Sequence, residues 1–331
     1  MGLPKRGLFA DSGRSFCGRL RQVNIGLPEK TVNVVESEEQ ADFISDIEPL
    51  LQRRPGAAHK NTFGQVLVAA GSLRYIGAPV LTARGSLVSG AGLVTVAVPE
   101  TAWSRGPGPS LPAALIVRRV NDGGDGCFSY DSISELEELA RQSSAAVFGP
   151  GVRTEAETGA GLLAILKQGK PTVIDADGLN LLAADSARYA GILEKAVLTP
   201  HLGEMSRLSR GFGLSGVSAG SRAEQAVRLA GRSGAVVVLK GQATVVAAPS
   251  GESWISSSGT SALATGGTGD VLAGLIGGML AQGKSRTEAS RIAVFTHGLA
   301  AETGGRAERA FTADDLDEAI SEAFKQITPF A

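Results

Sequence analysis

Short, continuously apolar segments alternate with helix-like segments from about residue 64 to the end of the chain. The apolar segments are residues 66–70, 92–98, 145–148, 172–175, 196–199 and 235–240. The helix-like segments include residues 78–89, 155–167 and 221–230, and residues 244–248 and 253–255 predict a hairpin. Strands without polar alternation are typical of a mostly parallel sheet that helices cover on both faces. The pattern therefore predicts a single large α/β domain.

A leader precedes this domain. Residues 1–30 carry far more basic than acidic side chains, which is typical of a disordered arm, with a transit peptide as the alternative. The basic residues are Lys5, Arg6, Arg14, Arg19, Arg21 and Lys30, and the acidic residues are Asp11 and Glu29. A helix-like acidic segment follows over residues 38–51, and Pro55 and Gly56 break the chain. We expect a leader over residues 1–55, partly disordered or helical, and the α/β domain over residues 56–331.

Composition excludes several classes of partner. The chain has 32 basic and 33 acidic residues, so it has no bulk attraction to nucleic acid or to a membrane surface. Cys17 and Cys127 match neither a zinc site nor a disulfide framework. No apolar run approaches the roughly 20 residues that span a bilayer, and no secretion signal is present. We expect a cytoplasmic protein that acts on small molecules.

Residues 264–270 read Ala-Thr-Gly-Gly-Thr-Gly-Asp and run directly into an apolar segment that continues at helical spacing to Leu280. A helix is therefore expected to begin at or just before Asp270. The free backbone N–H groups and partial positive charge of such a glycine-rich helix start favour a phosphate group. A carboxylate beside that site suits a base that takes a proton from an attacking hydroxyl group, although Asp270 as a helix cap is the alternative. The helix start is expected to lower the pKa of Asp270 and make it a weak base.

Several polar residues and glycines follow directly after predicted strands. They are Gly71, Gly149, Gly151, Asp175, Asp177, His201, Lys240 and Gly241. Ligands in parallel α/β sheets bind beyond the carboxyl ends of the strands, so these residues are expected to converge on one site.

Each charged member of this set has more than one interpretation. Lys240 either binds phosphate or extends to the surface, and His201 either contacts a ligand or is an ordinary loop histidine. Asp175 and Asp177 share one face of an extended chain, so they either hold a magnesium ion through water or cap the following helix, and Glu204 is a similar case. His297 and the two tryptophans are interpreted as structural.

Residues 278–285 match the P-loop pattern letter for letter. A P-loop requires a strand before it and a helix after it. Here the preceding residues belong to the helix that begins near Asp270, and Gly283 is interpreted as a helix-ending glycine. Ser285 and Glu288 have the spacing of a capping box for the next helix. The sequence therefore argues against a P-loop.

Taken together, these segments resemble the ribokinase-like superfamily and, more closely, the ADP-dependent NAD(P)H-hydrate dehydratase family. The resemblance runs from about His59 to residue 305. Its landmarks are residues 59–60, 63–64, 77–78, 89–95, 149–151, 175–180, 198–204, 238–241, 244 and 264–270. The Asp-Ala-Asp and Thr-Pro-His segments make the narrower resemblance specific. Other members carry an epimerase domain ahead of this one, and residues 1–55 are too few to hold it.

The resemblance implies repair of nicotinamide cofactors that have been hydrated on the ring, (6S)-NADHX and (6S)-NADPHX. ADP phosphorylates the added hydroxyl group, and phosphate then leaves to restore NADH or NADPH, with AMP as the other product. Mg²⁺ would accompany ADP, and the family resemblance also implies a homotetramer.

The resemblance also implies roles for individual residues. Asp270 would be the catalytic base and would contact the hydrate, with Ala78, Gly151 and His201 as further substrate contacts. The group expected to bind ADP and its transferring phosphate is Lys240, Gly241, Gln242, Ala243, Thr244, Gly267, Thr268 and Gly269.

Two other functions compete with this one. A ribokinase-like small-molecule kinase that uses ATP on a vitamin precursor would share Asp270 and the glycines, but would release a stable phosphorylated product. A catalytically silent nucleotide-binding module would tolerate loss of the Asp270 carboxylate. The combination of base, glycines and lysine argues against the silent module.

Overall fold

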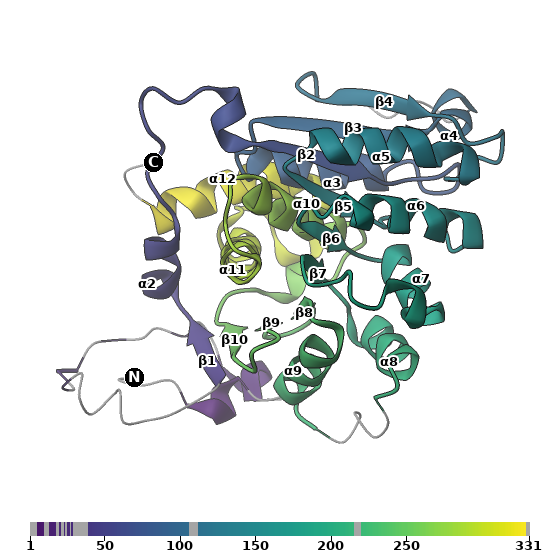
Figure 1. Ribbon diagram of the computed structural model, residues 1–331. Coiled ribbons are helices and arrows are strands. Elements are labelled where there is room, and N and C mark those ends of the chain that lie inside the picture. The colour runs from purple at the N-terminus through teal and green to yellow at the C-terminus, as the bar shows by residue number, and fades with distance from the viewer. Residues whose placement is uncertain are drawn as a thin grey trace.

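The computed structural model describes residues 39–105, 112–214 and 220–328, together with residues 5–9, 13–17, 20, 23, 25, 26 and 28. Within these residues, ten strands form one sheet in the order β1-β10-β9-β8-β7-β6-β5-β2-β3-β4 (Figure 1). The strands are β1 (Glu39–Asp42), β2 (Gln65–Ala69), β3 (Leu93–Pro99), β4 (Ile116–Val120), β5 (Ala145–Phe148), β6 (Thr172–Ile174), β7 (Ala196–Leu198), β8 (Val236–Leu239), β9 (Val245–Ala247) and β10 (Ser253–Ser256). Only β9 runs antiparallel to its neighbours in this described sheet, so the prediction of a mostly parallel sheet with one hairpin is confirmed.

Helices cover both faces of the sheet (Figure 1). They are α2 (Ile44–Ile47), α3 (Ala78–Val88), α4 (Glu100–Arg105), α5 (Ile133–Gln142), α6 (Ala156–Lys167), α7 (Asp177–Ala184), α8 (Leu202–Gly211), α9 (Arg222–Ser233), α10 (Thr268–Ala281), α11 (Arg286–Thr303) and α12 (Leu316–Ile327). Val66 and Val68 of β2 face the core formed with α3, α10, α11 and α12, whereas Leu67 and Ala69 face the core formed with α5 to α9. Because successive side chains of a strand point to opposite faces, one apolar strand serves both cores.

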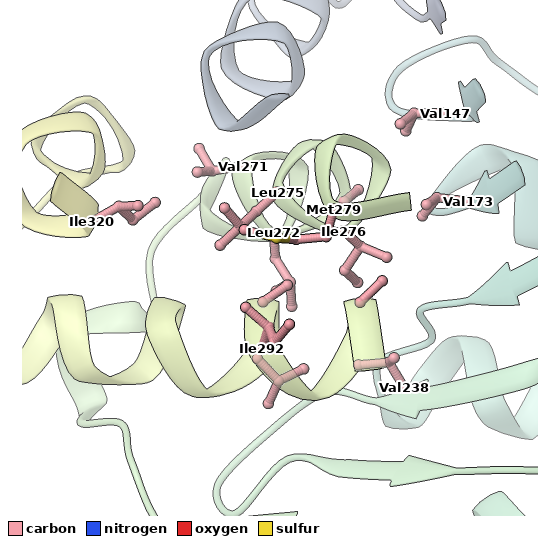
Figure 2. Packing of buried hydrophobic residues seen from close by; sticks show 14 of the residues in the cluster. Val147, Val173, Val238, Val271, Leu272, Leu275, Ile276, Met279, Ile292 and Ile320 are labelled. Carbon is pink, nitrogen blue, oxygen red and sulfur yellow. The ribbon is translucent and has the colours of Figure 1, made fainter. Parts of the chain in front are cut away.

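Helix α10 is the centre of the first core. Val271, Leu272, Leu275, Ile276 and Met279 are all buried, and they pack among Ile292 of α11, Ile320 of α12 and valines of the sheet (Figure 2). Gly274 lets α10 touch the α3 backbone, since a Cβ atom there would lie 1.9 Å from the Thr82 carbonyl oxygen. A side chain at this position would force the two helices apart. The position of α10 is therefore fixed from several sides.

The end of α10 confirms the argument against a P-loop. Residues 278–281 form its last turn, and Gly283 follows with a left-handed φ of +84°. Ser285 Oγ accepts a hydrogen bond from the Glu288 N–H group in the capping box that begins α11. The phosphate-binding pattern is thus a helix-to-helix connection.

The leader prediction is wrong in one part. Residues 39–42, which were expected to be helical, form β1, which pairs in parallel with β10 at the sheet edge, and only a short α2 and a 3₁₀ turn follow. The edge of β10 and a buried ion pair between Asp42 and Arg291, 2.6 Å apart, outweigh the local helix preference. Arg19, Arg21, Lys30, Asp11 and Glu29 of the basic arm lie outside the described residues. The boundary between residues 55 and 56 stays a prediction.

No helix in the described part of the chain is long and apolar enough to cross a membrane.

Candidate active site

The glycine-rich turn forms the start of α10. The helix begins at Thr268, with Gly267 at the cap position and a left-handed φ of +89°. Asp270 is therefore the third residue of the helix, and its interpretation as the helix cap is wrong. A Cβ atom on Gly267 would lie 2.4 Å from Leu81 Cδ1, so the turn is pressed against α3. The Thr268 hydroxyl group donates to the carbonyl oxygens of Leu263 and Thr265, at 2.9 and 3.1 Å, and ties the preceding loop to the helix.

Lys240 lies beside this turn. It follows β8, and its Nζ atom is 3.3 Å from the place where a Cβ atom of Gly269 would lie. Nζ donates to Asp175 Oδ1 at 2.6 Å and lies 4.0 Å from Glu204 Oε2. Although burial opposes the charged form, the carboxylates of Asp175 and Glu204 raise the pKa of Lys240 above its ordinary value. The lysine is therefore a fixed cation beside the first turn of α10.

The Asp270 carboxyl group has a pKa raised from 3.8 to about 7. Burial is the largest cause, the charge of Asp175 is the next, and Lys240 only partly offsets them. The expectation that the helix start lowers this pKa is wrong, because desolvation and neighbouring carboxylates outweigh the helix dipole. A carboxylate with a pKa near neutral pH is a stronger base than the one predicted from the sequence.

Asp175 and Asp177 do not share one extended face. Ala176 between them has a left-handed φ of +50°, and Asp177 begins α7. Asp175 is 1% exposed, and its Oδ1 atom also accepts from Thr199 Oγ1 at 2.8 Å. Asp177 Oδ2 accepts from the Arg153 N–H group at 2.9 Å instead. The turn at Ala176 therefore gives the two carboxylates separate partners.

His201 caps α8. Its Nδ1 atom accepts from the Gly203 N–H group at 2.9 Å, so the ring proton is on Nε2, which lies 3.4 Å from Glu204 Oε1. Burial and the nearby charges of Lys240 and Arg207 lower the pKa of His201, which keeps the ring neutral at pH 7. The histidine side chain is half exposed and can present this tautomer to a ligand.

Ala78 and Gly151 lie together, as predicted for two contacts of one substrate. A Cβ atom on Gly151 would be 3.1 Å from Ala78 Cβ and 2.6 Å from Tyr75 Cβ. Tyr75 is 44% exposed, and sequence reasoning did not single it out. The three residues come from the loop after β2, the start of α3 and the loop after β5, so the fold brings distant segments to one place.

A cavity of about 910 Å³ opens beside Lys240 and the start of α10. Seven of the eight residues predicted to bind nucleotide line it, namely Lys240, Gly241, Gln242, Ala243, Thr244, Thr268 and Gly269. Gly267 does not line the cavity and instead packs on Leu81. These seven residues therefore share one cavity, whereas Asp270, His201, Ala78 and Gly151 are not among its lining residues, and the binding role of the group stays a prediction.

Sequence reasoning missed much of the remaining lining of this cavity. The missed lining residues include Ser258, Gly259, Thr260, Ser261, Leu263, Val294, His297, Gly298, Glu302 and Glu308. His297, interpreted as structural, donates from Nε2 to the Thr268 carbonyl oxygen at 3.0 Å, and burial lowers its pKa to about 4. It supports the first turn of α10 as a neutral side chain. Its place beside that turn has no signal in the local sequence.

No group of three or more His, Cys, Asp or Glu side chains among the described residues is arranged to hold a metal ion. Magnesium is usually held by one or two carboxylates together with substrate phosphate oxygens. The charges of Asp177 and Glu204 both act on Asp270, so these two carboxylates lie near it and are the candidates for such a role. The Asp175 carboxylate already pairs with Lys240 and Thr199, and its predicted role in holding magnesium through water stays a prediction.

The sequence model of the NAD(P)H-hydrate dehydratase family matches residues 66–322. The chain belongs to the NAD(P)H-hydrate dehydratase family. It is 34% identical over 255 residues to the ADP-dependent (S)-NAD(P)H-hydrate dehydratase of Lactococcus lactis, covering 76% of this chain and 86% of that protein. The chain spans only 59% of the bifunctional NAD(P)H-hydrate repair enzyme of Moorella thermoacetica, with 35% identity over 95% of its own length.

The solved structures agree with this family. The ADP/ATP-dependent NAD(P)H-hydrate dehydratase of Bacillus subtilis, co-crystallized with ATP and Mg²⁺, superposes with a TM-score of 0.70 at 27% identity. The match covers 87% of this chain and 98% of the Bacillus chain. The ribokinase-like fold predicted from the sequence is thereby confirmed.

Proposed function

We propose that the chain dehydrates the hydrated cofactors (6S)-NADHX and (6S)-NADPHX with ADP, and releases NADH or NADPH, AMP and phosphate. The observation that carries the proposal is Asp270, a carboxyl group with a pKa of about 7 in the first turn of a helix that offers free N–H groups to phosphate. The family membership and the ADP-dependent relative support the choice of co-substrate.

The first step transfers the terminal phosphoryl group of ADP to the hydroxyl oxygen of the hydrated ring. The oxygen–phosphorus bond forms as the bond to AMP breaks, and the hydroxyl proton passes to the Asp270 carboxylate. The N–H groups at the start of α10 and the Lys240 ammonium group stabilise the negative charge on the moving group. A pKa near 7 matches this role, because the carboxylate is available at neutral pH and still binds a proton.

The second step expels phosphate. The carbon–oxygen bond breaks with its electron pair on phosphate, and the neighbouring ring carbon loses a proton to the departing phosphate, which restores the ring double bond. His201 and the pair formed by Ala78 and Gly151 would hold the dinucleotide. Phosphate is a far better leaving group than hydroxide, so the energy of ADP drives the loss of water.

Magnesium would neutralise the phosphate charge of the nucleotide. Asp177 and Glu204 are the carboxylates that would hold its waters. A cytoplasmic location and a homotetramer are further proposals that rest on the sequence and on the family resemblance. Light scattering coupled to gel filtration measures the assembly.

The test combines purified protein, ADP, Mg²⁺ and freshly prepared hydrate. We expect recovery of the reduced-nicotinamide absorbance together with equimolar AMP and phosphate. The Asp270→Ala variant should lose activity by at least the roughly 10²–10⁴-fold that is typical of removing a general base. A stable phosphorylated product formed only with ATP would instead favour the small-molecule kinase. Retention of full activity by Asp270→Ala would remove the proposed base.

A further inference from the structure

We propose that Asp175 is a positioning residue that holds the Lys240 ammonium group beside the first turn of α10 and does not itself contact the ligand. The inference rests on the proposed function, because it assigns Lys240 to the transferring phosphoryl group. It differs from the magnesium role predicted for Asp175 from the sequence, since it gives the carboxylate a protein partner.

Asp175 is fixed in the frame of the sheet. It follows β6 directly, and its N–H group donates to the Phe148 carbonyl oxygen of β5 at 3.1 Å. Its own carbonyl oxygen accepts from Gly178 in α7 at 2.9 Å. One carboxylate oxygen, Oδ1, accepts hydrogen bonds from Thr199 Oγ1 at 2.8 Å and from Lys240 Nζ at 2.6 Å. With its backbone bonded on both sides and 1% exposure, the side chain can act as a rigid acceptor.

Lys240 stands between Asp175 and the cavity. Lys240 lines the cavity and its side chain is 18% exposed, whereas Asp175 is not among the lining residues. The Nζ atom is close to Gly269, in the turn where phosphate would bind. Because the Asp175 side chain is only 1% exposed, it has almost no surface to present to a nucleotide, but it can direct the Lys240 ammonium group.

Lys240 needs such a partner because other carboxylates compete for it. Glu204 Oε2 lies 4.0 Å from Nζ, and the charge of Asp270 also acts on the lysine. A lysine side chain has four rotatable bonds, so an unanchored ammonium group would visit these partners. Pairing with Asp270 would occupy the proposed base. Asp175 therefore keeps Lys240 on the phosphate site and away from the base.

The charged groups around Asp270 come from several elements. Asp175 follows β6, Asp177 begins α7, Glu204 is in α8 and Lys240 follows β8, and all four act on Asp270. The charge of Lys240 also acts on His201 and His297, but both histidines have lowered pKa values and are neutral at pH 7. Loss of the Asp175 charge consequently removes the largest electrostatic cause that raises the pKa of Asp270.

The decisive variant is Asp175→Asn, which keeps the size and the acceptor oxygen and removes the charge. We expect a fall in kcat of roughly tenfold, a smaller change in KM for ADP, and an acidic limb of kcat/KM that moves down by about one pH unit. Thr199→Val loosens the carboxylate but keeps its charge, so it should lower kcat without moving the limb. It also provides a milder variant if Asp175→Asn folds poorly.

Asp42→Asn is the matched control. Asp42 forms an ion pair of the same 2.6 Å length with Arg291 and is similarly buried, but it lies at the sheet edge. This variant should lower the melting temperature and keep the pH profile of the wild-type enzyme. If the wild-type protein restores NADH while Asp175→Asn has an unchanged kcat and an unchanged acidic limb, the positioning role is refuted and the proposed function is not. If the wild-type protein restores no NADH, the proposed function fails and this role fails with it.

Discussion

Replacing Asp270 with asparagine should make the protein more stable at alkaline pH while abolishing its activity. The folded protein holds the Asp270 proton up to a pH of about 7, whereas the unfolded chain releases it near 3.8. Between these values the folded state binds more protons, so stability falls as the pH rises. Above pH 8 the Asp270 carboxyl group is ionised in both the folded and the unfolded state, so its whole contribution to stability has been lost. Asparagine does not ionise, so the Asp270→Asn variant does not lose this stability.

The magnitude follows from the two pKa values. The pKa of Asp270 differs by about three units between the folded and the unfolded state. This difference lowers the free energy of unfolding by about 4 kcal/mol at pH 8, since each pKa unit is worth about 1.4 kcal/mol. At pH 5 only about 1.7 kcal/mol of this has been lost. The stability gained by Asp270→Asn over the wild-type protein should therefore grow by about 2.5 kcal/mol between pH 5 and pH 8.

Urea unfolding of the ligand-free proteins at pH 5 and pH 8, followed by circular dichroism, measures this difference. Asp315→Asn is a suitable control, because the pKa of Asp315 is lowered by its hydrogen bonds to Thr312. A lowered pKa adds stability that is nearly constant above about pH 5, well above the unfolded pKa of 3.8, so this variant should show almost no change in its stability difference between the two pH values. An Asp270→Asn difference that stays constant, or that reverses sign at pH 8, would refute the reasoning about the buried carboxylate.

Three further predictions follow from the same site. The wild-type kcat/KM should rise with pH and level off above a midpoint near 7, because Asp270 must lose its proton before it can act as the base. A pH–rate profile in a mixed buffer measures this rise. Gly274→Ala should destabilise the fold by about 1–3 kcal/mol, because its Cβ atom would overlap the Thr82 carbonyl oxygen, and thermal unfolding tests this. Lys240→Met should raise KM for ADP by roughly tenfold or more in steady-state assays, whereas an unchanged KM would exclude a phosphate contact.

The alternation of apolar segments predicted most of the sheet, because a strand buried on both faces leaves an unbroken apolar run. Two edge strands lacked this signal. In β4, Arg118 and Arg119 are exposed and interrupt the run, and β1 contains Glu39 and Gln40, whose pairing depends on a distant β10. Edge strands have only one neighbour, so their polar residues resemble a loop or a helix in the sequence.

The site was predictable where it depends on strand ends, and less so where it depends on packing between distant segments. Lys240 and Asp175 could be placed near Asp270 because the carboxyl ends of parallel strands meet at one edge. The direction of the Asp270 pKa could not be inferred, because it is set by burial and by carboxylates far away in the sequence. The cavity wall from α11, including His297, was missed for the same reason.

The backbone contact between α3 and α10 also determines where the protein can adapt to its ligands. A helix whose Gly274 touches the Thr82 carbonyl oxygen can neither rotate nor slide without a collision, so the first turn of α10 is a fixed reference point. Adjustment to substrates of different shape must then occur in the surrounding connections, at residues 71–77, 241–244 and 258–264. Engineering of a new substrate range should begin in those loops and leave the helix pair untouched.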